Sequence, residues 1–235
     1  MKIVVLSITS YKEKDAIIDA ISEEGNLTFL AKGVLDPKNK NASITNTLCI
    51  ADIELTEGNY KYPVLKTVSI VLNPMVNNKY YYLSSLLLIA EATKALLQED
   101  ERELIFSNLV SVIYALKDSK EPWKLLLPYF VSLFNATGYG FETNQCVFCG
   151  SKQGIVTFSF PDGGFVCQNC YQEGMETGLT KTQMLLLRAA SNCKDIAKFD
   201  YSCSKEDAMA VLEKFFEFIY DSYGIHLKNA SLLRK

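Results

Sequence analysis

The sequence Cys146-Val147-Phe148-Cys149, followed after residues 150–166 by Cys167-Gln168-Asn169-Cys170, contains two CxxC pairs. Each pair forms a tight knuckle that turns two thiolates toward one ion, and two knuckles complete the tetrahedral shell that Zn²⁺ prefers. Between the pairs, residues 155–160 and 164–166 have the character of two strands that flank a Pro-Asp-Gly-Gly turn. The pattern therefore predicts a zinc ribbon.

The thiols of Cys146, Cys149, Cys167 and Cys170 are the candidate metal ligands, and the expected cofactor is one structural zinc ion per chain. A closed shell of four thiolates leaves no position for a catalytic water. The alternatives are two disulfides, a thioredoxin-like redox pair, chance core cysteines, or an iron–sulfur cluster, which also uses four cysteines. The total of seven cysteines is odd, which argues against a scaffold of paired disulfides.

Upstream of the cysteines, residues 1–77 are predicted to form a small barrel. Five short segments are rich in Val, Ile, Leu and Thr and are separated by Gly and Pro: residues 2–9, 16–21, 27–31, 48–56 and 64–72. A five-stranded OB-fold has this size and this number of strands. An SH3-like barrel has a similar strand count and is the alternative.

Residues 78–235 are predicted to form a helical domain into which the zinc module, at about 140–174, is inserted. Apolar residues recur at spacings of three and four, which predicts helices near 80–94, 101–117, 122–138, 181–190 and 204–223. Pro128 lies inside the third of these segments and predicts a kink. The expected fold class is therefore α+β with several domains.

The charge balance restricts the classes of partner. The chain has 24 Lys plus Arg and 27 Asp plus Glu, which gives a net charge of −3, so any contact with nucleic acid must come from a local basic patch. No apolar stretch reaches the roughly 20 residues of a membrane span, and the N-terminal apolar run is too short for a signal peptide. These features predict a soluble cytoplasmic protein without a membrane partner.

Signatures of catalysis are missing from the sequence. It contains no GxxxxGK[ST] phosphate loop and no GxGxxG after a strand. Its single histidine, His226, lies near the basic C-terminus and has no nucleophile with which to pair. A zinc deaminase requires an HxE segment, whereas His226 is followed by Leu227 and Lys228. We therefore expect a protein that is not an enzyme.

Several segments match a known family in order and in sequence. They are residues 2–6, 11–15, 31–33, 81–83, 130–139, 220–224 and 227–230, and the most specific block is 130–139, which leads into Cys146-x-x-Cys149-Gly150. In these segments and in its order of barrel, helices and zinc module, the chain resembles the RecO family of bacterial recombination-repair mediators.

The resemblance implies a DNA-repair factor that binds single- and double-stranded DNA and anneals strands. It further implies that the protein, with its partner RecR, helps to load RecA onto DNA coated by single-strand-binding protein, whose acidic C-terminal tail it contacts. The expected location is the cytoplasm, in association with the nucleoid. The family's basic loop after the third strand corresponds here to Lys32, Lys38 and Lys40, which are the candidate DNA contacts.

Other interpretations of the same residues are possible. The three lysines are equally consistent with an ordinary solvated loop. Tyr11, Tyr60 and Tyr62 are either stacking platforms for bases or, more commonly for such residues, part of the barrel core. The alternative function is a zinc-containing protein-interaction adaptor that does not bind DNA directly, which the acidic pI of about 5.4 favours.

Overall fold

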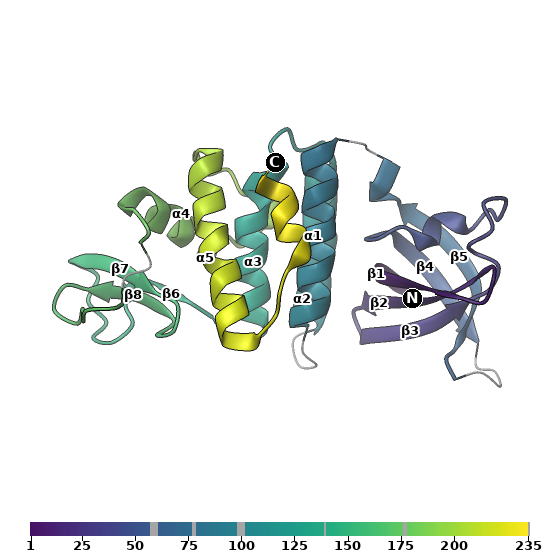
Figure 1. The fold of residues 1–235 in the computed structure, drawn as a ribbon, viewed down its shortest axis with the longest axis horizontal. Coiled ribbons are helices and arrows are strands. Elements are labelled where there is room, and N and C mark those ends of the chain that lie inside the picture. The colour runs from purple at the N-terminus through teal and green to yellow at the C-terminus, as the bar shows by residue number, and fades with distance from the viewer. Residues whose placement is uncertain (57–60, 77–78, 98–101, 139, 176–177, 235) are drawn as a thin grey trace.

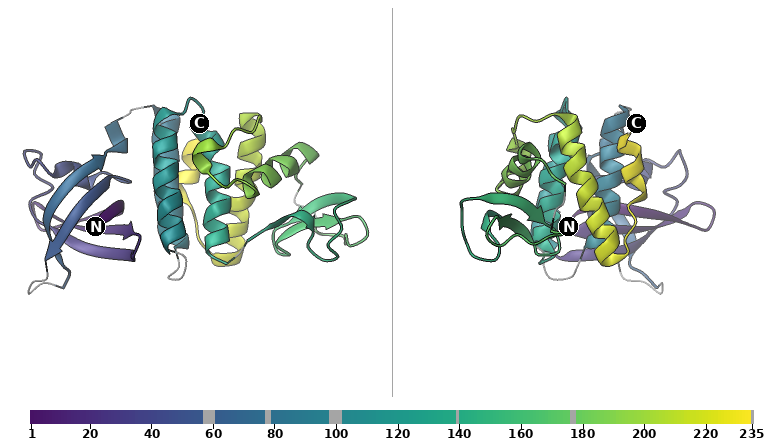
Figure 2. Two further views of the ribbon diagram at one scale, coloured as in Figure 1. Left: turned by 180° about the vertical axis from the view of Figure 1, so that it is seen from behind. Right: turned by 60° about the vertical axis from the view of Figure 1, so that its left-hand side comes forward.

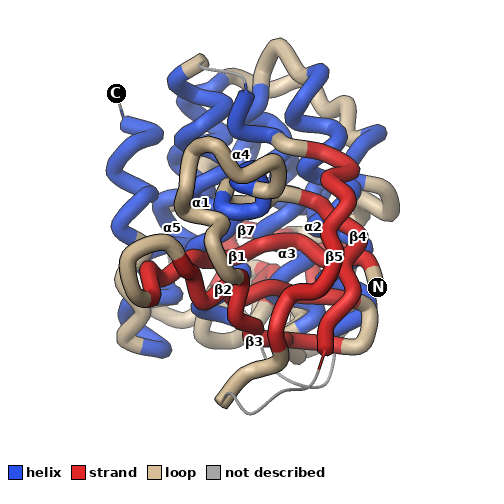
Figure 3. Tube along the Cα trace, turned by 90° about the vertical axis from the view of Figure 1, so that its right-hand side faces the viewer, coloured by secondary structure: helices blue, strands red, loops and turns tan. Residues whose placement is uncertain are grey.

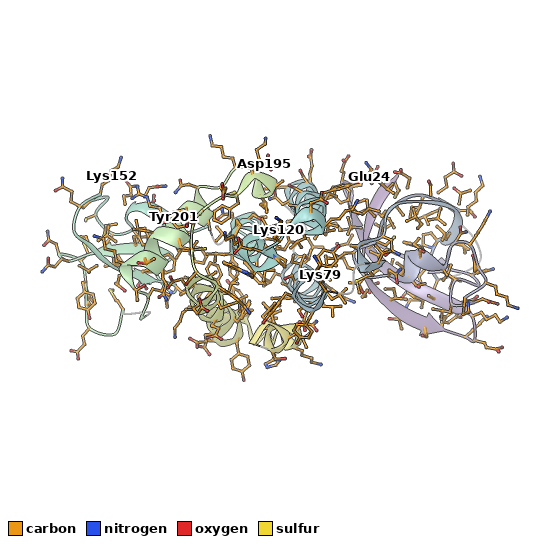
Figure 4. The ribbon with its side chains drawn as sticks, turned by 90° about the horizontal axis from the view of Figure 1, so that it is seen from above. Glu24, Lys79, Lys120, Lys152, Asp195 and Tyr201 are labelled. Carbon is orange, nitrogen blue, oxygen red and sulfur yellow. The ribbon has the colours of Figure 1, made fainter. Side chains whose placement is uncertain are left out.

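The computed structural model describes residues 1–235 apart from 57–60, 77–78, 98–101, 139, 176–177 and 235. The described part is elongated, with a β-barrel at one end, helices in the middle and a small three-stranded sheet at the other end (Figure 1). The view from above shows the same order, with Glu24 at the barrel, Lys79 and Lys120 among the helices, and Lys152 at the far end (Figure 4).

Five strands close into a barrel in the order β1-β2-β3-β5-β4. Their bounds are β1 Lys2–Tyr11, β2 Asp15–Ser22, β3 Gly25–Ala31, β4 Ile50–Thr56 and β5 Val64–Leu72. The pairs are antiparallel except for β3 with β5, which pair in parallel at Leu30 and Val64. The predicted OB-fold barrel is confirmed.

The first half of strand β1, residues 3–6, is buried on both of its faces. Side chains alternate along a strand, and here Ile3 and Val5 enter the core of the barrel while Val4 and Leu6 join the core formed by the helices. This double burial explains the uninterrupted apolar run at the start of the chain. The barrel packs in this way against α1 (Tyr80–Leu96). The view from behind shows the helices beside the barrel (Figure 2), and the view onto the barrel shows them behind its strands (Figure 3).

A polar cluster also joins the barrel to α1. The Nζ of Lys94 donates to Ser7 Oγ at 2.6 Å and to Asp19 Oδ2 at 2.8 Å, and Thr28 Oγ1 donates to the other oxygen of Asp19 at 2.9 Å. Burial raises the pKa of Asp19, but the hydrogen bonds from Lys94, Ser7 and Thr28 outweigh it and hold the pKa below its ordinary value. This cluster adds polar contacts between the barrel and α1 to the apolar packing of β1.

The middle of the molecule is a helical layer with one continuous core. Besides α1 it contains α2 (Arg102–Asp118), α3 (Leu126–Ala136), α4 (Lys181–Ser191) and α5 (Lys205–Tyr223). Helix α5 begins as predicted, because the side chain of its N-cap residue, Ser204, accepts a hydrogen bond from the third residue of the helix.

The prediction of one kinked helix over residues 122–138 is wrong, because the segment contains two separate elements. A 3-10 turn, η3 (Pro122–Leu125), is followed by the separate helix α3. Pro128 is the third residue of α3, within its first turn, where backbone N–H groups have no partner inside the helix. Its missing N–H therefore breaks no helical hydrogen bond, and no kink is needed.

The C-terminal segment is anchored to α1. Residues Lys228–Arg234 form a 3-10 helix, η5, and the carboxylate of Glu91 accepts the backbone N–H groups of Lys228 and Asn229 at 2.9 and 2.8 Å. The hydroxyl of Tyr80 donates to the carbonyl of Leu232 at 2.8 Å. A negative charge at the start of η5 satisfies its otherwise unpaired N–H groups.

Candidate metal centre and nucleic-acid interface

The four cysteines lie on a three-stranded sheet of order β6-β8-β7. Its strands are β6 (Glu142–Cys146), β7 (Ile155–Ser159) and β8 (Gly164–Cys167). The sequence predicted β7 and β8, but β6 was missed because its residues are mostly polar and do not alternate. Gly164 allows β6 to pair, since a Cβ atom there would lie 2.6 Å from the carbonyl oxygen of Glu142.

Both CxxC turns are held by backbone hydrogen bonds. In the first turn the N–H of Gly150 donates to the carbonyl of Cys146 at 2.9 Å, and Gly150 adopts φ +71°, which glycine tolerates best. In the second turn the N–H groups of Cys170 and Tyr171 donate to the carbonyl of Cys167 at 3.0 and 2.9 Å. The two turns aim their side chains at a common point.

The four Sγ atoms all lie within 4.8 Å of one another. Zinc–sulfur bonds of 2.3 Å in a tetrahedron require sulfur–sulfur edges of about 3.8 Å. The separation of Cys149 Sγ from Cys167 Sγ is 3.6 Å, far longer than a disulfide bond of about 2.05 Å, and the cysteines are free thiols. The donor set and its spacing therefore fit a single metal ion.

The electrostatics of the cluster also suit a cation. Burial raises the pKa of Cys146, but hydrogen bonds from the backbone N–H groups of Cys167, Cys149 and Phe148 outweigh it and lower the pKa to about 6. Hydrogen bonding to Cys149, with smaller contributions from burial and the other thiols, raises the pKa of Cys170 to about 12. The cluster therefore favours a thiolate at Cys146 and a protonated thiol at Cys170, and a bound divalent ion would favour the thiolate form of Cys170 as well.

Aromatic rings connect this sheet to the helices. Phe160 lies 4.8 Å from Phe158 and 5.0 Å from Phe215 of α5, measured between ring centroids. Phe141 contacts both Phe158 and Phe215, at 5.4 and 5.5 Å. The candidate metal centre is thus built on a module whose core is continuous with the helical core.

The candidate DNA contacts Lys32, Lys38 and Lys40 are all exposed on the loop between β3 and β4. The loop is held against the β1–β2 turn, because Asp15 accepts the backbone N–H of Gly33 at 2.8 Å. In Figure 1 the barrel that carries this loop lies at the opposite end of the molecule from the sheet that carries the cysteines. The structure therefore separates the two predicted sites.

Asp36, the acidic residue within the lysine loop, is used to build the loop. Its carboxylate accepts the backbone N–H of Lys38 and the Nζ of Lys14, both at 3.0 Å. These interactions, the backbone hydrogen bond first, lower the pKa of Asp36 below its ordinary value. The carboxylate is thus ionised at neutral pH and engaged within the loop.

Sequence reasoning missed two further lysines at this end of the barrel. Lys12 follows β1 in the β1–β2 turn, and Lys61 precedes β5. The backbone N–H of Leu30 donates to the carbonyl of Pro63 at 2.8 Å, which brings the start of β5 beside the end of β3. No local pattern signals this proximity, because it depends on the parallel pairing of β3 with β5.

Among the described residues, no helix combines the length and the apolar character needed to cross a bilayer.

These features define a class of protein in which an OB-fold is joined to a helical domain that carries a cluster of four thiols able to hold a metal ion. The family model for the N-terminal part of recombination protein O matches residues 1–73, and the model for its C-terminal part matches residues 78–230. The chain belongs to the RecO family of DNA repair proteins.

Curated relatives agree with this assignment. The chain is 24% identical to the DNA repair protein RecO of Halalkalibacterium halodurans, over 98% of this chain and 92% of the relative. It is 28% identical to the protein of the same name from Clostridium perfringens, over 98% and 95%. With the Clostridium novyi protein the identity is 29%, over 74% and 69%.

Proposed function

We propose that this chain is a mediator of DNA repair and homologous recombination that binds single- and double-stranded DNA, anneals strands and catalyses no reaction. Membership of the RecO family supports the class of function. The observation that carries direct DNA contact is the exposed lysine loop on an OB-fold, with Lys32, Lys38 and Lys40 beside the β1–β2 turn. OB-folds bind strands through cations that track the backbone and through aromatic rings.

The proposal extends to protein partners. With RecR, the chain helps to load RecA onto DNA coated by single-strand-binding protein, and it contacts the acidic tail of that protein. A net charge of −3 limits electrostatic attraction to DNA, so partners that are themselves bound to DNA would raise the local concentration of this chain. In a bacterial cell these contacts place it in the cytoplasm, with the nucleoid.

We also propose a division of labour along the chain. Residues 1–77 form the DNA-binding barrel, residues 78–235 form the helical domain, and the inserted module at about 140–174 carries the metal. One zinc ion bound by Cys146, Cys149, Cys167 and Cys170 would have a structural role, because four thiolates close its coordination shell.

Metal content is the direct test of the zinc assignment. Protein purified without chelators is expected to contain about one zinc per chain, because the sulfur positions fit one tetrahedral ion. Inductively coupled plasma mass spectrometry measures this ratio. Iron with inorganic sulfide in place of zinc would identify a cluster instead, and protein without any metal would contradict both assignments.

DNA binding is tested by titrating fluorescent single-stranded and duplex oligonucleotides across a salt series. We expect affinity for both to fall steeply with salt, because bound lysines release counterions from phosphates. Changing Lys32, Lys38 and Lys40 together to Ala should weaken binding and reduce the salt slope for single strands by about 2. The melting temperature should not change, since all three side chains are exposed.

The matched control removes the same charge elsewhere. Three other exposed lysines lie far from the loop: Lys152 on the cysteine module, Lys181 at the start of α4, and Lys194 after α4. Changing these three to Ala should leave the salt slope near that of the wild type. If both triple variants lost the same affinity for DNA and the same salt slope, the loop would not be the DNA contact. If the wild type binds no DNA even at low salt, the adaptor function becomes the better explanation.

A further inference from the structure

A small pocket lies on the outer wall of the barrel, at the end that carries the lysine loop. Its volume is about 230 Å³, and Tyr11, Ile17, Leu30, Lys61 and Tyr62 line it. This is below the roughly 300–1,000 Å³ of sites for drug-sized ligands. The pocket therefore suits one flat ring rather than a larger molecule.

The pocket has an apolar base and aromatic sides. Ile17 of β2 and Leu30 of β3 are direct partners in the sheet, and both point away from the barrel core, since their neighbours Ile18 and Phe29 belong to it. Tyr11, the last residue of β1, is 38% exposed, and Tyr60, the third tyrosine considered from the sequence, lies outside the described residues. Tyr11 thus lies at the β1–β2 turn and Tyr62 in the segment between β4 and β5, both beside the outer face of β2 and β3. OB-folds bind oligonucleotides on this face and with these two loops.

Each tyrosine has a lysine beside it in sequence and in space. The Nζ of Lys12 lies 5.4 Å from the centre of the Tyr11 ring, and the Nζ of Lys61 lies 5.2 Å from that of Tyr62. These are distances of cation–π contacts. A lysine has a flexible four-carbon stem, so its ammonium can move to a phosphate while the ring receives a base.

We infer that the pocket formed by Tyr11 and Tyr62 binds one unpaired base of single-stranded DNA, with Lys12 and Lys61 on the flanking phosphates. This inference rests on the proposed DNA binding and deepens it. Charge complementarity selects a polyanion, and the flat aromatic pocket selects a partner that offers an unstacked ring. The bases of a duplex are stacked on their neighbours and cannot enter, so the pocket separates single strands from duplex, whereas the lysine loop contacts phosphates of both.

The test uses an oligothymidine that carries a single 2-aminopurine, whose fluorescence is quenched when the base stacks. Tyr11→Leu/Tyr62→Leu keeps apolar bulk but removes both rings, and Tyr11→Phe/Tyr62→Phe keeps the rings. We expect the wild type and the Phe variant to quench the probe. The Leu variant should lose the quenching and bind single strands at least about fivefold more weakly, with unchanged affinity for duplex.

Two controls accompany these variants. Tyr114→Leu changes another exposed tyrosine, 44% exposed on α2 and therefore outside the barrel, and should bind both DNAs like the wild type. Thermal unfolding of each variant shows whether the barrel remains folded. The salt slope for single strands should be the same in the Leu and Phe variants, since the phosphate contacts remain.

The outcomes separate this inference from the proposed function. If the wild type binds DNA and the Leu variant matches it in affinity and quenching, the pocket does not bind a base, although the proposed DNA binding stands. Equal weakening toward single strands and duplex in the Leu variant would assign the rings to barrel stability and also overturn the inference. A wild type that binds no DNA at low salt overturns the proposed function, and the inference with it.

Discussion

Cys149→Ser is expected to abolish stoichiometric zinc binding and to unfold the module at about 140–174. Cys149 is exposed, so the substitution leaves no cavity, and its effect arises through the metal site. Structural zinc contributes about 10–16 kcal/mol in small zinc peptides, which is as large as the whole free energy of unfolding of a typical domain, about 5–15 kcal/mol. If the free energy of unfolding fell by only about 4 kcal/mol, the melting temperature would fall by at least about 8 °C.

Metal analysis, thermal unfolding and limited proteolysis measure this effect together. Cleavage should begin within the module, while the barrel, which has its own core, stays resistant. Cys193→Ser is the matched control, because Cys193 is a half-buried thiol outside the cluster whose donation to the carbonyl of Asp195 a serine hydroxyl can reproduce. A Cys149→Ser protein that retains one zinc per chain would remove Cys149 from the ligand set.

Phe215→Ala is expected to destabilise the protein by about 3–5 kcal/mol, the usual cost of removing a buried phenylalanine ring. Phe215 is fully buried on α5, and its ring contacts those of Phe134, Phe141 and Phe160 at centroid distances of 5.5, 5.5 and 5.0 Å. These partners come from α3, from the residue before β6, and from the turn after β7. The variant therefore leaves a cavity where the metal module meets the helices.

Urea unfolding measures this loss through the midpoint and slope of the transition. Tyr220→Ala changes another aromatic residue of α5, but Tyr220 is 56% exposed, and the expected loss is below about 1 kcal/mol. Phe215→Leu should fall between the two, since it fills part of the cavity. If Phe215→Ala matches the Tyr220 variant, the aromatic rings do not form a shared core.

The clustering of the four thiols and the barrel strands were predictable because their signals are local. The CxxC spacing sets the geometry of a knuckle within a few residues, and the structure brings all four sulfurs together as that spacing requires. The start of α5 was predictable for the same reason, since Ser204 caps a backbone group three residues away.

Two elements were not predictable from their own residues. Strand β6 has the mostly polar sequence Glu142-Thr143-Asn144-Gln145-Cys146, and it becomes a strand only because β8 pairs with it and Gly164 lets the two backbones approach. At Pro128, the sequence shows a residue that disrupts helices but not where the helix begins. The preceding 3-10 turn places Pro128 in a first turn, where it is tolerated.

The amino-acid sequence alone determined which residues form the barrel strands and most of the helices, and which thiols are available to a metal, because hydrophobic periodicity, caps and knuckle spacing act over a few residues. Only the tertiary structure decided that Tyr11 and Tyr62 share a pocket and that Phe160 reaches the core of the helices. Both depend on contacts between distant segments: the first on the closure of the barrel through β3 and β5, and the second on burial of apolar surface that the small metal module cannot cover by itself.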